Sequence, residues 1–131
     1  MPLVAGHTFL YPLDNVPHLW VIATEPCNGI VAIVNFTSLK GSKDQTVVLL
    51  KHEHAFLRWD TSVNFAQAET MSEERLQEYI QQGRAKMHSP IDAVLVQLIV
   101  DGFCASPYTK NRIVTFVAEY RASHRAIKLG A

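Results

Sequence analysis

Two histidines stand at places in this sequence where an imidazole could transfer protons. His18 follows Pro17 and precedes the apolar run Leu19–Ala23, and His54 is the second member of a His-x-His pair that begins at His52. Histidine is the side chain best suited to proton transfer near neutral pH. Two such groups flanking a ribose phosphate suffice to cleave RNA without a metal: one takes the 2′-hydroxyl proton, and the other protonates the leaving oxygen. The competing interpretation is that a lone histidine at the start of a strand is structural.

His52 and His54 also have the spacing of a metal-binding pair. On an extended backbone, side chains two positions apart point to the same side. A zinc site needs a third protein ligand, however, and Glu53 points the other way while no His-rich or Cys-rich element lies nearby in the sequence. The six glycines are scattered and form neither a P-loop nor a dinucleotide fingerprint. We therefore expect neither a metal nor any other cofactor.

Hydroxyl groups gather where expected strands end or begin. Thr37 and Ser38 close an apolar run, and Ser62 opens another segment with strand character. Such hydroxyls could hold a phosphate or stabilise a charged transition state, or they could simply satisfy the last amide groups of the sheet. No Gly-x-Ser-x-Gly elbow surrounds Ser38, which argues against a serine hydrolase.

The two tryptophans could stack on nucleic-acid bases. Trp20 lies within an apolar strand, so we expect it in the core. Trp59 stands beside Arg58 and Asp60 in a polar segment and is the better candidate for a stacking surface. Arg58 is a second group there that could contact a base.

The composition is that of an ordinary globular domain. With 131 residues, 48% of them hydrophobic and 18% charged, the chain is long enough to bury roughly two thirds of its unfolded surface. Twelve basic residues balance twelve acidic ones, so no overall field draws in nucleic acid. A local basic patch could still do so.

Cellular location is predicted from the cysteines and the apolar segments. Cys27 and Cys104 match no zinc signature, and we expect two free thiols in a reducing cytoplasm. The first ten residues lack the basic start of a signal peptide. The longest apolar runs, about eight residues, fall short of the roughly 20 that span a bilayer. We expect a cytoplasmic protein without a membrane segment.

The first 70 residues are predicted to form about five strands. Asn28-Gly29 predicts a two-residue hairpin turn, because both residue types tolerate positive φ. The strands on either side of it are apolar throughout, which indicates a sheet covered on both faces. The expected strands are His7–Leu13, Leu19–Ala23, Ile30–Val34, Gln45–Leu50 and Ser62–Thr70, with a structured loop over residues 51–60.

From residue 72 onward the apolar spacing becomes that of helices. Ser72 is expected to cap a first helix that Gly83 stops. Ser89-Pro90 is expected to open a second, which Gly102 stops. A third is expected to open at Ser106-Pro107.

Strands followed by helices indicate the α+β class, since parallel βαβ folds would alternate the two. We predict a single domain over residues 1–131. Its residues 1–70 would form a small, strongly curved antiparallel barrel or half-barrel, and residues 71–131 three helices packed on it.

The order of these pieces resembles the PemK/MazF family of plasmid-maintenance toxins. In that family, a strand with a glycine start leads through a loop to a strand that begins near an arginine. A hairpin, a strand ending in a Thr-Ser pair and a serine-containing strand followed by a helix come next. Over about the first 80 residues, these places are taken by Gly6, Leu19–Ala23, Val31–Ser38 and Ser62–Leu76, and the sharpest motif is Val34–Ser38.

This resemblance implies an SH3-like barrel that forms a two-fold homodimer. It further implies a toxin-like endoribonuclease that cleaves single-stranded RNA without metal, leaves a cyclic phosphate and is restrained by an antitoxin protein. Thr37 and Ser38 match the family's pair directly. The family's loop arginine has no equivalent, because the first arginine of this chain is Arg58, and His18 stands near its place.

The resulting hypothesis assigns catalytic roles to His18, His54 and Thr37, and substrate binding to Ser38, Ser62, Arg58 and Trp59. The alternative is a non-catalytic SH3-like barrel that binds a protein or peptide partner. A basic, concave surface joining the candidate residues would favour the enzyme. An exposed apolar patch near Phe56, Leu57 and Trp59 would favour the binding module.

Overall fold

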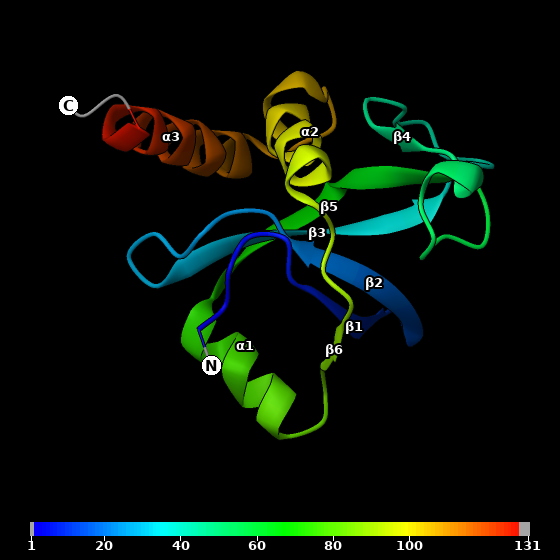
Figure 1. Cartoon of the computed structure of the whole chain (residues 1–131), viewed down its shortest axis with the longest axis horizontal. Coiled ribbons are helices and arrows are strands. Elements are labelled where there is room, and N and C mark those ends of the chain that lie inside the picture. The colour runs from blue at the N-terminus through cyan, green and yellow to red at the C-terminus, as the bar shows by residue number, and fades with distance from the viewer. Residues whose placement is uncertain (1, 129–131) are drawn as a thin grey trace.

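The computed structural model describes the backbone of residues 2–128 and the side chains of residues 2–124 (Figure 1). Six strands form one antiparallel sheet in the order β4-β5-β3-β2-β1-β6. The strands are β1 (Thr8–Leu13), β2 (Val16–Ile22), β3 (Ile30–Ser38), β4 (Val48–Leu49), β5 (Thr61–Ser72) and β6 (Lys86–His88). The helices are α1 (Glu73–Gln81), α2 (Ala93–Ala105) and α3 (Asn111–Lys128), with a short 3₁₀ turn, η1, at Lys51–Glu53.

Two tight turns join the first three strands. Asp14 and Asn15, with φ of 51° and 64°, connect β1 to β2. Asn28 and Gly29, with φ of 51° and 76°, lie in the turn before β3. Residues with positive φ at both central positions match the right-handed twist of the flanking strands. The hairpin predicted at Asn28-Gly29 is confirmed.

Both faces of the sheet are covered. Figure 1 shows α2 and α3 above the sheet and α1 below it. The side chains of β2 alternate accordingly: Val21 belongs to the core under α2 and α3, whereas Trp20 and Ile22 belong to the core beside α1. The same alternation continues along β3, so the prediction of strands covered on both sides is confirmed. The two sides are called the α2–α3 face and the α1 face below.

The α+β class is confirmed, but the sheet is open. Its edges are β4 and β6, which do not pair with each other. The last strand, β6, was not predicted from the sequence, because three residues carry too little periodic signal. It pairs with β1 through Thr8, Phe9 and Leu10. In the order of the chain, α1 therefore comes between β5 and β6, whereas the sequence predicted that all strands would precede the helices.

The first predicted helix is confirmed at its start. The side chain of Ser72 accepts a hydrogen bond of 3.2 Å from the amide of Arg75. Gly83, with φ of 75°, follows the end of α1.

The predicted start of the second helix at Ser89-Pro90 is wrong. Asp92 is the cap of α2 instead, and its Oδ1 accepts from the amide of Leu95 at 2.8 Å. Residues 89–91 lie outside any helix or strand and are hydrogen-bonded to the N-terminal segment. Thr8 donates to the carbonyl of Ser89 at 2.6 Å, and the amide of Ile91 donates to Gly6 at 3.0 Å.

The predicted stop at Gly102 is also wrong, because α2 continues to Ala105. Gly102 is a packing position. A Cβ there would lie 2.5 Å from Cζ of Phe65 and 2.9 Å from Cγ2 of Val47. Glycine lets the helix approach the sheet closely at this point.

Two further boundaries shift for one physical reason, the hydrogen bonds of Asp44. Its Oδ1 accepts from the amide and the hydroxyl of Thr46, so the expected strand Gln45–Leu50 shrinks to Val48–Leu49. Its Oδ2 accepts from Ser106, which keeps residues 106–110 in a turn and delays α3 to Asn111.

A large bulge interrupts the pairing of β3 with β5. Asn35 lies opposite Asn64, and Ile33 lies opposite Glu69. Residues 65–68 of β5 therefore face Val34 alone, and the extra length bends the sheet. Phe65 and Ala68 from this bulge both pack into the α2–α3 face.

Cys27 and Cys104 are free thiols. Within residues 2–128, no helix combines the length and the apolar character that a membrane crossing requires.

Candidate functional site

Several predicted site residues lie in neighbouring positions on the α1 face. Thr37 of β3 is paired with Ser62 of β5. Trp20 of β2 is paired with Asn35 of β3, and His18, two residues before Trp20, lies on the same face of β2 just beyond the last pair between these two strands. Directly opposed side chains share one face of a sheet. We call His18, Asn35, Thr37, Ser62 and Asn64 the polar row.

His18 is half-buried at the outer end of this row. It lies opposite Tyr11 of β1, whose ring stacks on Tyr79 of α1 at 5.7 Å. The indole of Trp20 donates to the carbonyl of Tyr11 at 3.1 Å, which fixes the neighbouring backbone. Among the described residues, the imidazole of His18 has no hydrogen-bond partner, so both of its ring nitrogens are available to a ligand.

Ser62 is the member of the row opposite Thr37, and it is fully buried. Its hydroxyl donates to the hydroxyl of Ser42 at 2.8 Å, which ties the loop after β3 to the sheet. Thr37 is half-buried, whereas Ser38 alternates to the other side of the strand and is exposed. Of the predicted hydroxyls, Thr37 is therefore the one best placed to touch a ligand next to His18.

Asn35 is a member of the row that sequence reasoning missed. It is fully buried, and neither atom of its carboxamide has a hydrogen-bond partner among the described residues. A buried polar group without a partner costs about 1–3 kcal/mol, and each such group in a native structure calls for an explanation. The available signal was a single asparagine inside the apolar run from Ile30 to Phe36.

The structure does not bring His54 together with His18. The ring of His54 lies 5.8 Å from that of Phe56, which in turn lies 5.8 Å from Phe36. Phe36 belongs to the α2–α3 face, on the side of the sheet opposite the polar row. Instead, His54 and His88 line a separate hollow of about 520 Å³ beside the start of α2.

Arg58 and Trp59 lie in the exposed loop before β5, at the end of the sheet where the polar row begins. Trp59 is 58% exposed. The amide of Leu39 donates to the carbonyl of Asp60 at 3.0 Å, so this loop follows the end of β3 closely. Its Phe56 and Leu57 pack into the α2–α3 core and form no exposed apolar patch with Trp59.

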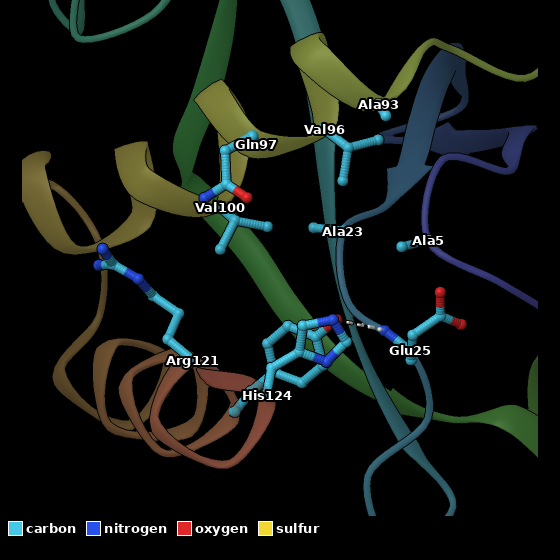
Figure 2. A pocket seen from close by; sticks show the side chains of 10 residues that line it. Ala5, Ala23, Glu25, Ala93, Val96, Gln97, Val100, Arg121 and His124 are labelled. Carbon is cyan, nitrogen blue, oxygen red and sulfur yellow. Dashed lines mark hydrogen bonds between the residues drawn. The ribbon is translucent and has the colours of Figure 1, made fainter. Parts of the chain in front are cut away.

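A further cavity of about 430 Å³ lies between α2, α3 and the segment that follows β2 (Figure 2). Titratable residues from distant parts of the sequence line it, among them Glu25, Tyr120, Arg121 and His124. No local motif joins these residues, so the sequence carried no signal for this cavity. In contrast, the described residues contain no cluster of three or more histidine, cysteine or acidic side chains able to hold a metal ion.

Comparison with known proteins gives no relative from which a role could be transferred. No protein-family model matches the chain, no curated protein matches its sequence, and no solved structure matches its fold. A function for this chain therefore has to be argued from its own side chains.

Proposed function

We propose that the chain is a metal-independent endoribonuclease of the PemK/MazF type that cuts single-stranded RNA at the polar row. The observation that carries this proposal is the pairing of Thr37 with Ser62, together with the place of His18 two residues before Trp20, which is itself paired with Asn35. In this proposal, the imidazole of His18 would lie near the hydroxyl of Thr37, at the end of the sheet where the exposed side chains of Arg58 and Trp59 lie.

In the proposed reaction, His18 takes the proton of a ribose 2′-hydroxyl. The 2′-oxygen then attacks the adjacent phosphorus, and the bond from phosphorus to the 5′-oxygen breaks. The products are a 2′,3′-cyclic phosphate and a 5′-hydroxyl, whose proton comes from the imidazolium or from water. Thr37 donates a hydrogen bond to a non-bridging oxygen, where charge develops in the transition state.

Other residues, in the row and in the loop before β5, would position the rim of the site and the bound strand. Ser62 holds Ser42 and thereby the loop at the rim, because the hydroxyls of the two serines are hydrogen-bonded. Trp59 would stack on a base of the bound strand, and Arg58 would contact the same or the next nucleotide. His54 has no part in this reaction, since it lies on the other face of the sheet.

The same proposal includes a two-fold homodimer, an open variant of the SH3-like barrel, an antitoxin partner and a cytoplasmic location. The edge strands β4 and β6 have only two and three residues. Short edges resist pairing with other chains, so the dimer would form through a side-chain surface. Light scattering at micromolar concentration would distinguish a dimer from a monomer of 14.7 kDa.

RNA cleavage by the purified chain tests the proposal directly. Proton transfer by a positioned side chain contributes about 10²–10⁴-fold to a rate, so His18→Ala should lose roughly that factor. Thr37→Val should also be impaired. The matched controls are His52→Ala and His54→Ala, which remove histidines outside the row and should cut RNA like the wild type. A chelator should have no effect.

Two results would contradict the proposal: no RNA cleaved by the wild type, or full activity in His18→Ala. The alternative, a non-catalytic module that binds a protein or peptide, would then take its place. It is favoured by an apolar strip on α2, where Val94 and Leu98 are 73% and 52% exposed. A partner bound there should be released by Val94→Glu.

A further inference from the structure

We infer that the cavity between α2, α3 and the segment after β2 binds a small organic cation with an apolar body, and that this site is separate from the polar row. Figure 2 shows the cavity with α2 on one side and His124 of α3 on another, and Tyr120 of α3 also lines it.

The size and lining of the cavity suit a small molecule. Its volume of about 430 Å³ falls within the range of roughly 300–1,000 Å³ typical of ligand pockets. Ala5, Ala23 and Ala93 line it with side chains too small to fill it, and Val96 and Val100 of α2 add apolar surface. This lining would hold a hydrocarbon or aromatic body.

An unpaired carboxylate lies at one end of the cavity. Figure 2 shows the carboxylate of Glu25 beside Ala5. The backbone amide of Glu25 donates to the hydroxyl of Tyr120 at 3.3 Å, which fixes the position of the residue. Among the described residues, however, no hydrogen bond or ion pair reaches its carboxylate. A half-buried anion without a partner favours a cationic ligand.

The positive charge at the other end of the cavity is already balanced. Nη2 of Arg121 lies 3.2 Å from Oδ1 of Asp101. The same Asp101 oxygen accepts from the side-chain Nε2 of Gln97 at 3.0 Å. Since Arg121 has its own counter-ion, Glu25 carries the unbalanced charge of the cavity.

The aromatic wall fits the same class of ligand. The rings of Tyr120 and His124 stack with centroids 5.2 Å apart and planes 24° apart. Burial raises the pKa of Tyr120, so its phenol stays neutral at physiological pH and does not add a competing charge. The face of a neutral phenol ring attracts a cation and also packs against apolar groups.

Three probes of nearly equal shape test the charge preference: phenethylamine, 2-phenylethanol and 3-phenylpropionate. Calorimetric titration of the full chain at pH 8, where histidine side chains are ordinarily neutral, should detect binding of the amine. The alcohol should bind at least about tenfold more weakly, because it lacks the charge-assisted hydrogen bond to Glu25. The carboxylate should not bind.

Variants locate the site. Glu25→Gln should lower the affinity for the amine to that for the alcohol, whereas Glu78→Gln, which removes an exposed carboxylate of α1, should change nothing. Ala93→Leu should weaken both ligands by filling the cavity, and it should fold normally because Ala93 is exposed. His18→Ala should bind the amine like the wild type, which separates this site from RNA cleavage.

The inference is overturned if the amine and the alcohol bind the wild type equally, or if none of the probes binds at millimolar concentration. It is also overturned if Glu25→Gln, with an unchanged melting temperature, keeps its preference for the amine. Chemical-shift changes on amine binding that miss the amides of Val96, Val100 and Tyr120 would likewise exclude this cavity.

Discussion

A hydrogen bond of 2.7 Å from the hydroxyl of Ser106 to Oδ2 of Asp44 joins the end of α2 to the loop before β4. Both residues are buried. The other oxygen of Asp44 accepts from Thr46, and the hydroxyl of Ser106 accepts from the amide of Tyr108. Two loops far apart in the sequence are therefore fixed to each other. One of them carries Ser42, the partner of Ser62 at the polar row.

Replacing Asp44 should test this link. Asp44→Ala removes three hydrogen bonds to a buried carboxylate and leaves the hydroxyl of Ser106 without its acceptor, so the free energy of unfolding should fall by about 2–3 kcal/mol. Urea denaturation would measure the loss. Lys43→Ala, an exposed neighbour in the same loop, should change stability by less than about 0.5 kcal/mol. Equal losses in the two variants would contradict this account.

Asn35→Leu should make the protein more stable. The two side chains have the same number of heavy atoms and the same branching at Cγ, and leucine removes a buried carboxamide whose atoms have no partner among the described residues. A gain of about 1–2 kcal/mol is expected, which would raise the melting temperature by roughly 3–6 °C. If the carboxamide of Asn35 takes part in RNA cleavage at the polar row, the same substitution should also lower the cleavage rate. A destabilised variant would mean that the carboxamide has partners, such as an enclosed water, that leucine cannot replace.

Gly102→Ala should destabilise the protein even though alanine favours helices. The propensity gain is about 1 kcal/mol, but overpacking of a core costs typically about 1–3 kcal/mol, and the added Cβ would lie 2.5 Å from Cζ of Phe65. Phe65→Leu removes that Cζ atom. In the Phe65→Leu background, the added alanine should therefore be tolerated better than in the wild type, which a double-mutant cycle by urea denaturation would measure.

Glu69 should stabilise the protein slightly at neutral pH and not at low pH. Burial raises the pKa of Glu69, but hydrogen bonds and charge attraction from Lys110 and Arg112, at 2.6 and 2.7 Å, outweigh it, and the pKa is lowered overall. A lowered pKa gives a contribution that is complete above the unfolded-state value of about 4.3. The contribution is lost as the pH falls through the folded-state value.

The variant Glu69→Gln measures this contribution. Because the ion pairs are exposed, the variant should lose less than about 1 kcal/mol at pH 7. The difference from the wild type should shrink in high salt and close as the carboxylate is protonated in acid. A loss that persists unchanged at low pH would assign the role of Glu69 to packing instead of charge.

The sequence correctly predicted the features that depend only on residues close together in the chain. Asn28-Gly29 forms the expected turn, Ser72 caps α1, and the apolar strands on both sides of the turn are covered on both faces. Each of these follows from backbone preference or from the period of apolar residues, which a single segment contains in full.

The features that the sequence did not predict depend on contacts between residues far apart in the chain. Ser89-Pro90 has the residues of a helix start, but residues 89–91 are hydrogen-bonded to the N-terminal segment and α2 begins only after them. His54 is close to the other site residues in sequence, yet the packing of Phe56 on Phe36 takes it to the opposite face. The bulge after Asn64 sets which residue of β5 faces Thr37, and no local signal marks it.

The pairing of β1 with β6 also has a consequence for synthesis of the chain. One edge of β1 is paired by β2 as soon as that strand has been made, but its other edge is paired only by Lys86–His88. Until those residues leave the ribosome, the nascent sheet has an open edge at Thr8–Leu10, and unpaired edges invite association with other chains. A ribosome that stalls before residue 88 would release an aggregation-prone fragment, whereas one that stalls just after it would release a chain with this edge closed.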